Sequence, residues 1–72
     1  MVGPTQFYNV DVVAEHFKSK KFEAQKMTGI RGEVNLLVVS RRGKAAMKFI
    51  VRNGAIRVKH LLAVVKDYAA GR

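Results

Sequence analysis

Seven cationic side chains and no acidic one lie between residues 41 and 59. They are Arg41, Arg42, Lys44, Lys48, Arg52, Arg57 and Lys59. An arginine offers a phosphate two parallel N–H donors, and a lysine offers it a point charge. Neutralising several phosphates releases counterions, so a cluster of this kind favours a polyanion at low salt. We therefore expect these residues, here called the main basic group, to bind nucleic acid through its phosphate backbone.

A second set of cations, the secondary basic group, surrounds the end of the first predicted helix. Its members are Lys18, Lys20, Lys21, Lys26 and Arg31. Cations near a helix C-terminus interact favourably with the helix dipole, so a solvated helix end explains this group as well as a binding role does. Both interpretations stay open at the level of the sequence.

The overall charge supports an anionic partner. The 72 residues include 14 Lys and Arg against 5 Asp and Glu, which gives a net charge of +9. Solubility of a small domain needs a net charge of only roughly 2 to 8. The first interpretation is a regulatory or architectural nucleic-acid-binding protein, DNA or RNA. The second is a small basic inhibitor or adaptor that docks on an acidic protein surface, for example of the transcription machinery, and a viral origin would suit it. A membrane surface is disfavoured, because the first helix lacks Trp and the core needs its apolar face.

Groups suited to catalysis or metal binding are few and separated. The chain has no Cys, which excludes disulfides and thiolate metal sites. His16 and His60 are far apart, Asp11 and Glu15 fit a solvated helix start, and neither serine stands in a nucleophile motif. We therefore expect a protein that is not an enzyme and takes no metal, cofactor or small-molecule substrate.

Six aromatic side chains are candidates for stacking on nucleobases. Phe17, Phe49 and Tyr68 fall on predicted apolar faces, so we assign them to the core. The candidates that remain are Phe7, Tyr8 and Phe22. Because so few aromatics remain, the sequence slightly favours a duplex over a single strand.

Helical periodicity predicts a helix over residues 9–20. Its apolar face consists of Val10, Val13, Ala14 and Phe17. Asn9 or Asp11 is suited to cap it. A strand is the alternative, because apolar residues also alternate from Tyr8 to Ala14.

Residues 21–28 are ambiguous. Good helix formers and a following Gly29 favour a helix that ends there. Phe22, however, falls off the apolar face of the preceding helix, which favours a strand that starts near it.

From Glu33 onward the sequence predicts three strands, over residues 33–40, 45–52 and 55–59. Arg42-Gly43 and Asn53-Gly54 supply the turns, and Asn-Gly is typical of a type I′ hairpin. Pairing about these turns gives an apolar face of Val34, Leu36, Val38, Met47, Phe49, Val51, Ile56 and Val58. It places Lys48 opposite Lys59 on the other face, which also carries Arg52, Arg57, Leu37, Val39 and Ile50.

Residues 60–70 are predicted to form a closing helix over the apolar face of this sheet. Its apolar face consists of Leu61, Val64, Val65 and Tyr68. We thus expect one α+β domain over residues 1–72, with residues 1–8 as a loosely ordered arm. The architecture is an N-terminal helix, a three-stranded antiparallel meander with a fourth strand near 22–28 as an option, and a C-terminal helix.

The sequence also gives expectations about oligomeric state and location. The outer edge of strand 33–40 would attract a second copy if residues 22–28 did not pair with it, so a homodimer is plausible. Neither of the longest apolar runs, at 36–39 and 61–65, approaches the roughly 20 residues of a membrane span. The lack of Cys and of a signal-like start is compatible with a cytoplasmic protein.

Overall fold

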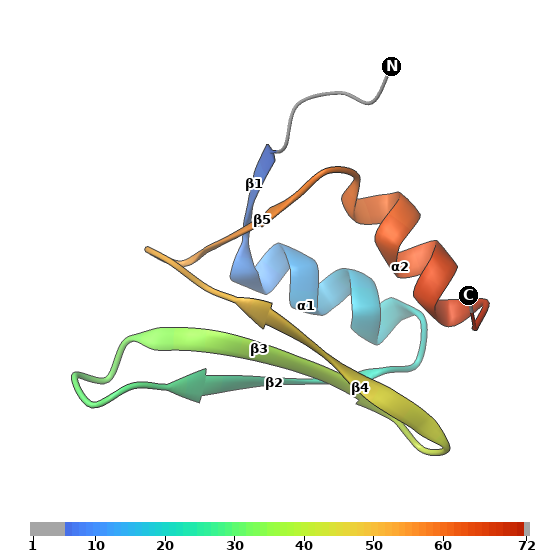
Figure 1. The fold of residues 1–72 in the computed structure, drawn as a ribbon, viewed down its shortest axis with the longest axis horizontal. Coiled ribbons are helices and arrows are strands. Elements are labelled where there is room, and N and C mark those ends of the chain that lie inside the picture. The colour runs from blue at the N-terminus through green and yellow to red at the C-terminus, as the bar shows by residue number, and fades with distance from the viewer. Residues whose placement is uncertain (1–5, 72) are drawn as a thin grey trace.

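In residues 6–71, which the computed structural model describes, two helices and two small antiparallel sheets surround one core (Figure 1). The strands are β1 (Gln6–Asn9), β2 (Glu23–Thr28), β3 (Val34–Arg41), β4 (Lys44–Ile50) and β5 (Ala55–Val58). The helices are α1 (Val10–Ser19) and α2 (Leu61–Ala69). The predicted α+β class, with an N-terminal helix, an antiparallel three-stranded meander and a C-terminal helix, is confirmed. The optional strand near 22–28 is the first strand of that meander, and β5 lies outside it.

Helix α1 begins and ends at local sequence signals. The Asn9 side chain accepts a hydrogen bond from the Asp11 N–H at 2.8 Å, which satisfies one of the free donors of the first turn. At the other end, the N–H groups of Lys21 and Phe22 donate to the carbonyls of Lys18 and Phe17. This is a Schellman motif, and its usual apolar contact is made by the Phe17 and Phe22 rings, 5.8 Å apart between centroids. The predicted inward face of α1 is confirmed, because all four of its residues are buried.

The ambiguous segment is a strand. Residues 23–28 form β2, which pairs antiparallel with β3, so the option of a helix ending at Gly29 is wrong. The chain reverses at residues 29–32, where the Gly29 N–H donates to the Glu33 carbonyl at 2.7 Å. Strand β3 is therefore the central strand, in the order β2-β3-β4. The free β3 edge that suggested a homodimer does not exist.

The register of β3 on β4 differs from the prediction by one residue. Arg41 pairs with Lys44, as the turn requires, but Val39 then pairs with Met47 and Leu37 with Phe49. Two residues of β4, Ala45 and Ala46, thus lie opposite Ser40 alone, which is a β-bulge.

This bulge exchanges the two faces of β3. Leu37 and Val39, which we expected on the outer face, are completely buried. Leu36 and Val38, which we expected in the core, are only half-buried and lie on the opposite face, across from the exposed Ile50 and Lys48. The face predicted for Met47 and Phe49 of β4, and for Val51 directly after it, is correct.

Strand β5 does not continue the meander. The Asn53-Gly54 turn is present, with positive φ at both residues, and hydrogen bonds of 2.9 and 3.0 Å join Arg52 to Ala55. Beyond that bridge β4 and β5 diverge, and β5 pairs with β1 instead (Figure 1). The predicted pairing of Lys48 with Lys59 is therefore wrong. Residues 6–8, expected to belong to a loose arm, are part of β1, while residues 1–5 of that arm lie outside the described residues.

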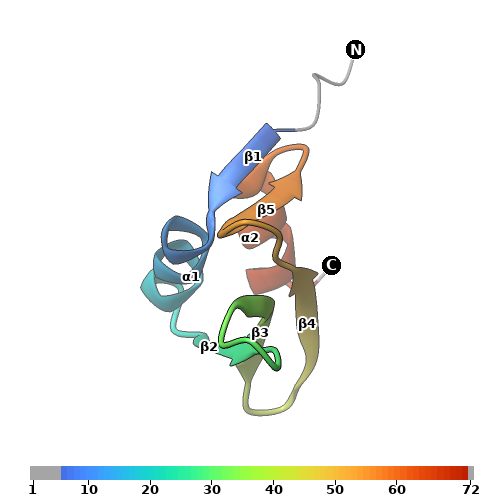
Figure 2. The same ribbon diagram turned by 90° about the vertical axis from the view of Figure 1, so that its left-hand side faces the viewer.

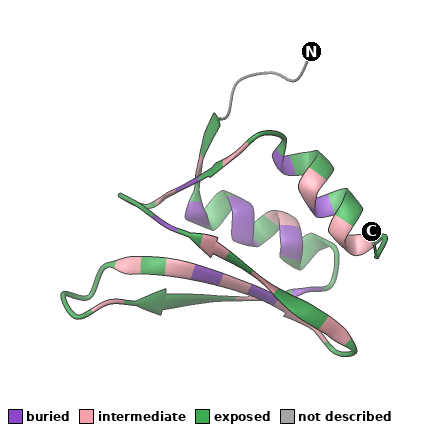
Figure 3. Ribbon diagram, viewed as in Figure 1, coloured by how far each residue is buried: buried purple, intermediate pink, exposed green. Residues whose placement is uncertain are grey.

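The core lies between the two helices and the inner faces of both sheets (Figures 2 and 3). Phe17, Val13, Leu37, Val39 and Ile56 are its largest fully buried side chains. Helix α2 adds Leu61 and Val65 and meets the sheet through Tyr68, whose hydroxyl donates to the Ala45 carbonyl. The expected contact between the closing helix and the apolar side of the sheet is confirmed.

Neither helix of residues 6–71 is long and apolar enough to cross a bilayer.

Candidate functional site

The structure divides the main basic group among three places. Lys48, Arg52 and Arg57 line one groove. The β3–β4 turn, at the end of the β2-β3-β4 sheet that lies away from this groove, carries Arg41, Arg42 and Lys44 (Figure 1). Lys59 directly follows β5. The single cationic sheet face expected from the sequence is therefore replaced by a smaller cluster on two diverging strands.

The groove, here called the β4–β5 groove, has a volume of about 560 Å³. It lies where β4 and β5 separate after the Asn53-Gly54 turn. Its lining residues are Phe7, Lys48, Phe49, Ile50, Arg52, Ala55, Ile56 and Arg57. None of these described lining residues is acidic, so three positive charges meet there without a carboxylate among them.

The turn that closes the groove is fixed to the rest of the fold. The Gly54 carbonyl accepts a hydrogen bond of 2.8 Å from the N–H of Val10, the first residue of α1. Val51, next to the turn, is buried, and its N–H donates to the Asn35 carbonyl at 3.0 Å. Arg52 therefore extends from a backbone that is anchored on both sides.

Two apolar side chains of the groove are open to solvent. Phe7 is 69% exposed and Ile50 is 68% exposed. Phe7 is paired with Arg57 across β1 and β5, so the ring and the guanidinium share one face of this two-stranded sheet. The groove thus combines an exposed aromatic ring, an exposed aliphatic side chain and three exposed cations.

Arg41 has internal partners instead of an open surface. Its guanidinium carbon lies 4.2 Å from the centroid of the Phe22 ring. Its two terminal nitrogens donate to the carbonyls of Lys20, at 3.3 Å, and Ala69, at 3.4 Å. These carbonyls belong to the C-terminal ends of α1 and α2, so Arg41 connects both helices to β3.

Lys44 is also used within the fold. It is half-buried, and its ammonium lies 5.0 Å from the centroid of the Tyr68 ring, within cation–π range. Arg42 and Lys59 are exposed. Outside the groove, Arg42 and Lys59 are thus the exposed members of the main basic group.

The secondary basic group is dispersed over several elements. Lys18 lies 3.6 Å from Glu15 on α1, and Lys26 of β2 donates to Asp11 at 2.5 Å. Lys20 and Lys21 follow the end of α1, and Arg31 lies in the β2–β3 turn. The ion pairs found among residues 6–71 belong to this group, and none involves the main basic group.

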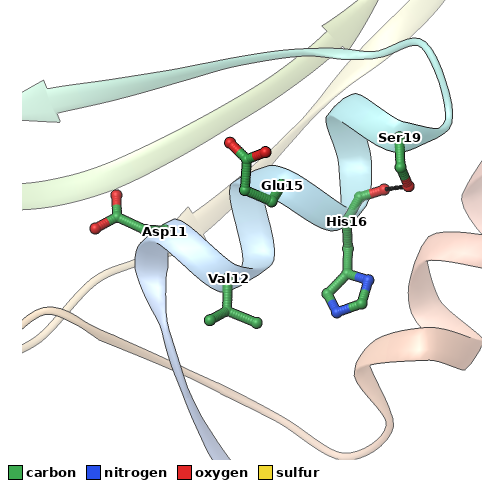
Figure 4. Close-up of a pocket in the computed structure, with 5 residues that line it drawn as sticks. All are labelled: Asp11, Val12, Glu15, His16 and Ser19. Atoms are coloured by element: carbon green, nitrogen blue, oxygen red, sulfur yellow. Dashed lines mark hydrogen bonds between the residues drawn. The ribbon is translucent and has the colours of Figure 1, made fainter.

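A shallow pocket of about 340 Å³ on α1 holds the remaining polar residues of interest (Figure 4). Asp11, Glu15, His16 and Ser19 line it together with Val12. The Ser19 hydroxyl donates to the backbone carbonyl of His16 at 2.5 Å, and the Asp11 carboxylate accepts from Lys26. Both groups therefore have structural partners. Within residues 6–71, no three His, Cys, Asp or Glu side chains come together as a metal site would require.

The aromatic candidates separate clearly by exposure. Phe22 is 4% exposed and belongs to the core, Tyr8 is half-buried against it, and Phe7 is the open one. Phe17, Phe49 and Tyr68 pack in or against the core as predicted. Phe7 could be predicted from the sequence as a stacking candidate. Its position beside Arg57 could not, because no local signal specifies that β1 pairs with β5.

Comparison with known proteins does not assign this chain to a family. No protein-family model matches the chain, and neither curated proteins nor solved structures give a significant match.

Proposed function

We propose that this protein binds nucleic acid, in a regulatory or architectural role, through phosphate contacts made by Lys48, Arg52 and Arg57. The observation that carries the proposal is the β4–β5 groove, which these three cations line without an acidic residue. Like charges gathered in this way repel one another, and a bound polyanion removes that repulsion.

The net charge and the surrounding surface support the same function. A net charge of +9 raises the local concentration of anions and speeds encounter with polyanions. Arg42 and Lys59, both exposed, are available for further phosphate contacts. Arg41 and Lys44 contribute to the fold and are left out of the proposed interface.

The experiment is a fluorescence-anisotropy titration of labelled single- and double-stranded oligonucleotides at about 50 mM and 200 mM salt. The Arg52→Ala/Arg57→Ala variant should bind more weakly than the wild type. It should also reduce the slope of log K against log salt by roughly 0.7–0.9 for each phosphate that the variant no longer neutralises.

A matched control is Lys20→Ala/Lys66→Ala, which removes the same net charge from exposed positions outside the groove. It should keep most of the affinity and the salt slope. Equally weakened binding by the two variants would mean that charge alone acts and that the groove has no special role.

The competing function is that of a basic inhibitor or adaptor on an acidic protein surface, where the same cations would steer association. It takes the place of our proposal if the wild type binds none of the oligonucleotides at the lower salt. A cytoplasmic location belongs to the proposal, since the chain has no Cys to suggest an oxidising compartment.

A further inference from the structure

We infer that the β4–β5 groove takes a single-stranded segment of nucleic acid, with one base stacked on the Phe7 ring. This inference rests on the proposed function, because it names the form of nucleic acid that the same site binds. It reverses the slight preference for a duplex that the sequence alone suggested.

The first argument is the exposure of Phe7. The ring is 69% exposed although the other three phenylalanines are buried or packed against the core. An aromatic ring held in a strand is a flat apolar surface, and every nucleobase has a π face that fits it. Inside a duplex both faces of a base are covered by its neighbours, so only an unpaired strand offers such faces along its length.

The second argument is the position of Phe7 relative to the cations. It is paired with Arg57 in the β1–β5 sheet and shares the groove with Lys48 and Arg52. Proteins that bind single strands combine aromatic rings for the bases with cations that follow the backbone. A surface for duplex phosphates needs only the cations and would gain nothing from the ring.

The third argument is Ile50, which is 68% exposed and lines the same groove. Its apolar surface gains nothing from phosphates but can be removed from water by a base or a sugar. The lining of the groove therefore matches a nucleic-acid strand that exposes both its apolar bases and its anionic phosphates.

The direct test is the Phe7→Trp variant, because the chain contains no Trp and the new indole is the sole Trp fluorophore, whose emission can be followed apart from that of the two tyrosines. Its fluorescence should be quenched when an oligothymidylate of about 12 nucleotides binds, a length within the range that one small fold covers. An oligouridylate of the same length distinguishes DNA from RNA. A blunt duplex of equal length should leave the indole emission nearly unchanged.

The affinity test is Phe7→Ala, with Leu62→Ala as a matched control on α2, where Leu62 is 67% exposed. Loss of one stacked base should weaken single-strand binding by about 5- to 150-fold. Duplex binding should change by less than about two-fold, because the cations that hold phosphates stay in place. Leu62→Ala should bind both forms like the wild type. Thermal unfolding of Phe7→Ala, monitored by circular dichroism, verifies that the variant is folded with a stability close to that of the wild type.

The outcomes separate the two proposals. If the wild type binds no oligonucleotide, the proposed function itself is wrong. If the wild type binds single strands, Phe7→Ala binds them equally well and the Phe7→Trp emission does not respond, then the function stands and the stacking inference is wrong. A duplex that binds more tightly than the single strand and also loses affinity in Phe7→Ala would overturn the inference as well.

Discussion

The guanidinium of Arg41 lies over the ring of Phe22, 4.2 Å from its centroid, and the same ring stacks on Tyr68 with centroids 5.0 Å apart. Phe22 lies in the connection between α1 and β2, directly before the first residue of β2, and Tyr68 belongs to α2. The three side chains therefore join both helices to the sheet at one point. Two residues of the main basic group, Arg41 and Lys44, have structural contacts at this point.

Arg41→Ala should lower the free energy of unfolding by about 1–3 kcal/mol, because it removes a cation–π contact and two hydrogen bonds to helix-end carbonyls. Oligonucleotide affinity at constant temperature should change little. Arg42→Ala removes the same charge from the adjacent exposed residue and should leave the melting temperature unchanged. A large drop in affinity in Arg41→Ala without any decrease in stability would show that Arg41 belongs to the binding surface.

Tyr68→Phe should cost about 0.5–1.5 kcal/mol of stability, because the Ala45 carbonyl loses its hydroxyl donor while the ring stays in place. Tyr68→Ala should cost more, since the stack on Phe22 and the packing on Phe17 go with it. Urea unfolding followed by circular dichroism measures both values. Equal effects of the two variants would mean that the ring contributes nothing.

Lys21→Gly should raise the free energy of unfolding by about 0.5–1 kcal/mol. Lys21 has a φ of 69° in the Schellman motif, a conformation that costs roughly 1–2 kcal/mol for a residue with a Cβ. Lys20, its neighbour, has a φ of −99°, so Lys20→Gly should instead be neutral or destabilising. A lower melting temperature for Lys21→Gly than for the wild type contradicts the prediction.

Gly54→Val should destabilise the protein by about 1–2 kcal/mol or more, because Gly54 has a φ of 74° and β-branched residues avoid this region. Apart from the two adjacent residues, no atom lies within 4 Å of an added Cβ, so the Cβ itself meets no steric obstacle. Gly54→Asn should cost less, since Asn tolerates the left-handed conformation. Differential scanning calorimetry of the two variants checks the order, and equal melting temperatures would refute it.

Features encoded by a few consecutive residues could be predicted from the sequence. Asn9 caps α1, the spacing of Val10, Val13, Ala14 and Phe17 defines its buried face, and Asn53-Gly54 forms a turn with positive φ at both residues. Each of these depends on the backbone conformation of a few residues or on side-chain spacing within about two helical turns.

The face of β3 could not be predicted, because Leu36-Leu37-Val38-Val39 is apolar in either phase. A register shift of one residue exchanges the two faces of a strand. Only a strand in which polar and apolar residues alternate shows from its sequence which face is buried. The bulge at Ala45-Ala46 carries no distinctive residue, so nothing in the sequence marks the shift.

The partner of β5 could not be predicted either. A two-residue turn reverses the chain, but it does not require the strands on both sides to stay paired. Ile56 is buried with β5 paired to β1, and pairing with β4 would remove its side chain from water equally well. The candidate site was therefore found only in part: Lys48, Arg52 and Arg57 were named from charge, whereas their separation from Lys59 and the position of Phe7 depend on pairing between distant segments.

The pairing of β1 with β5 also sets the order of events during biosynthesis. Phe7 leaves the ribosome before its neighbour Arg57, which follows only after α1, β2, β3 and β4 have been translated. Contacts between such distant segments form late, since the intervening chain must first close a long loop. While residues 55–58 are still inside the ribosome, the emerged chain therefore carries most of the positive charge but has no assembled groove.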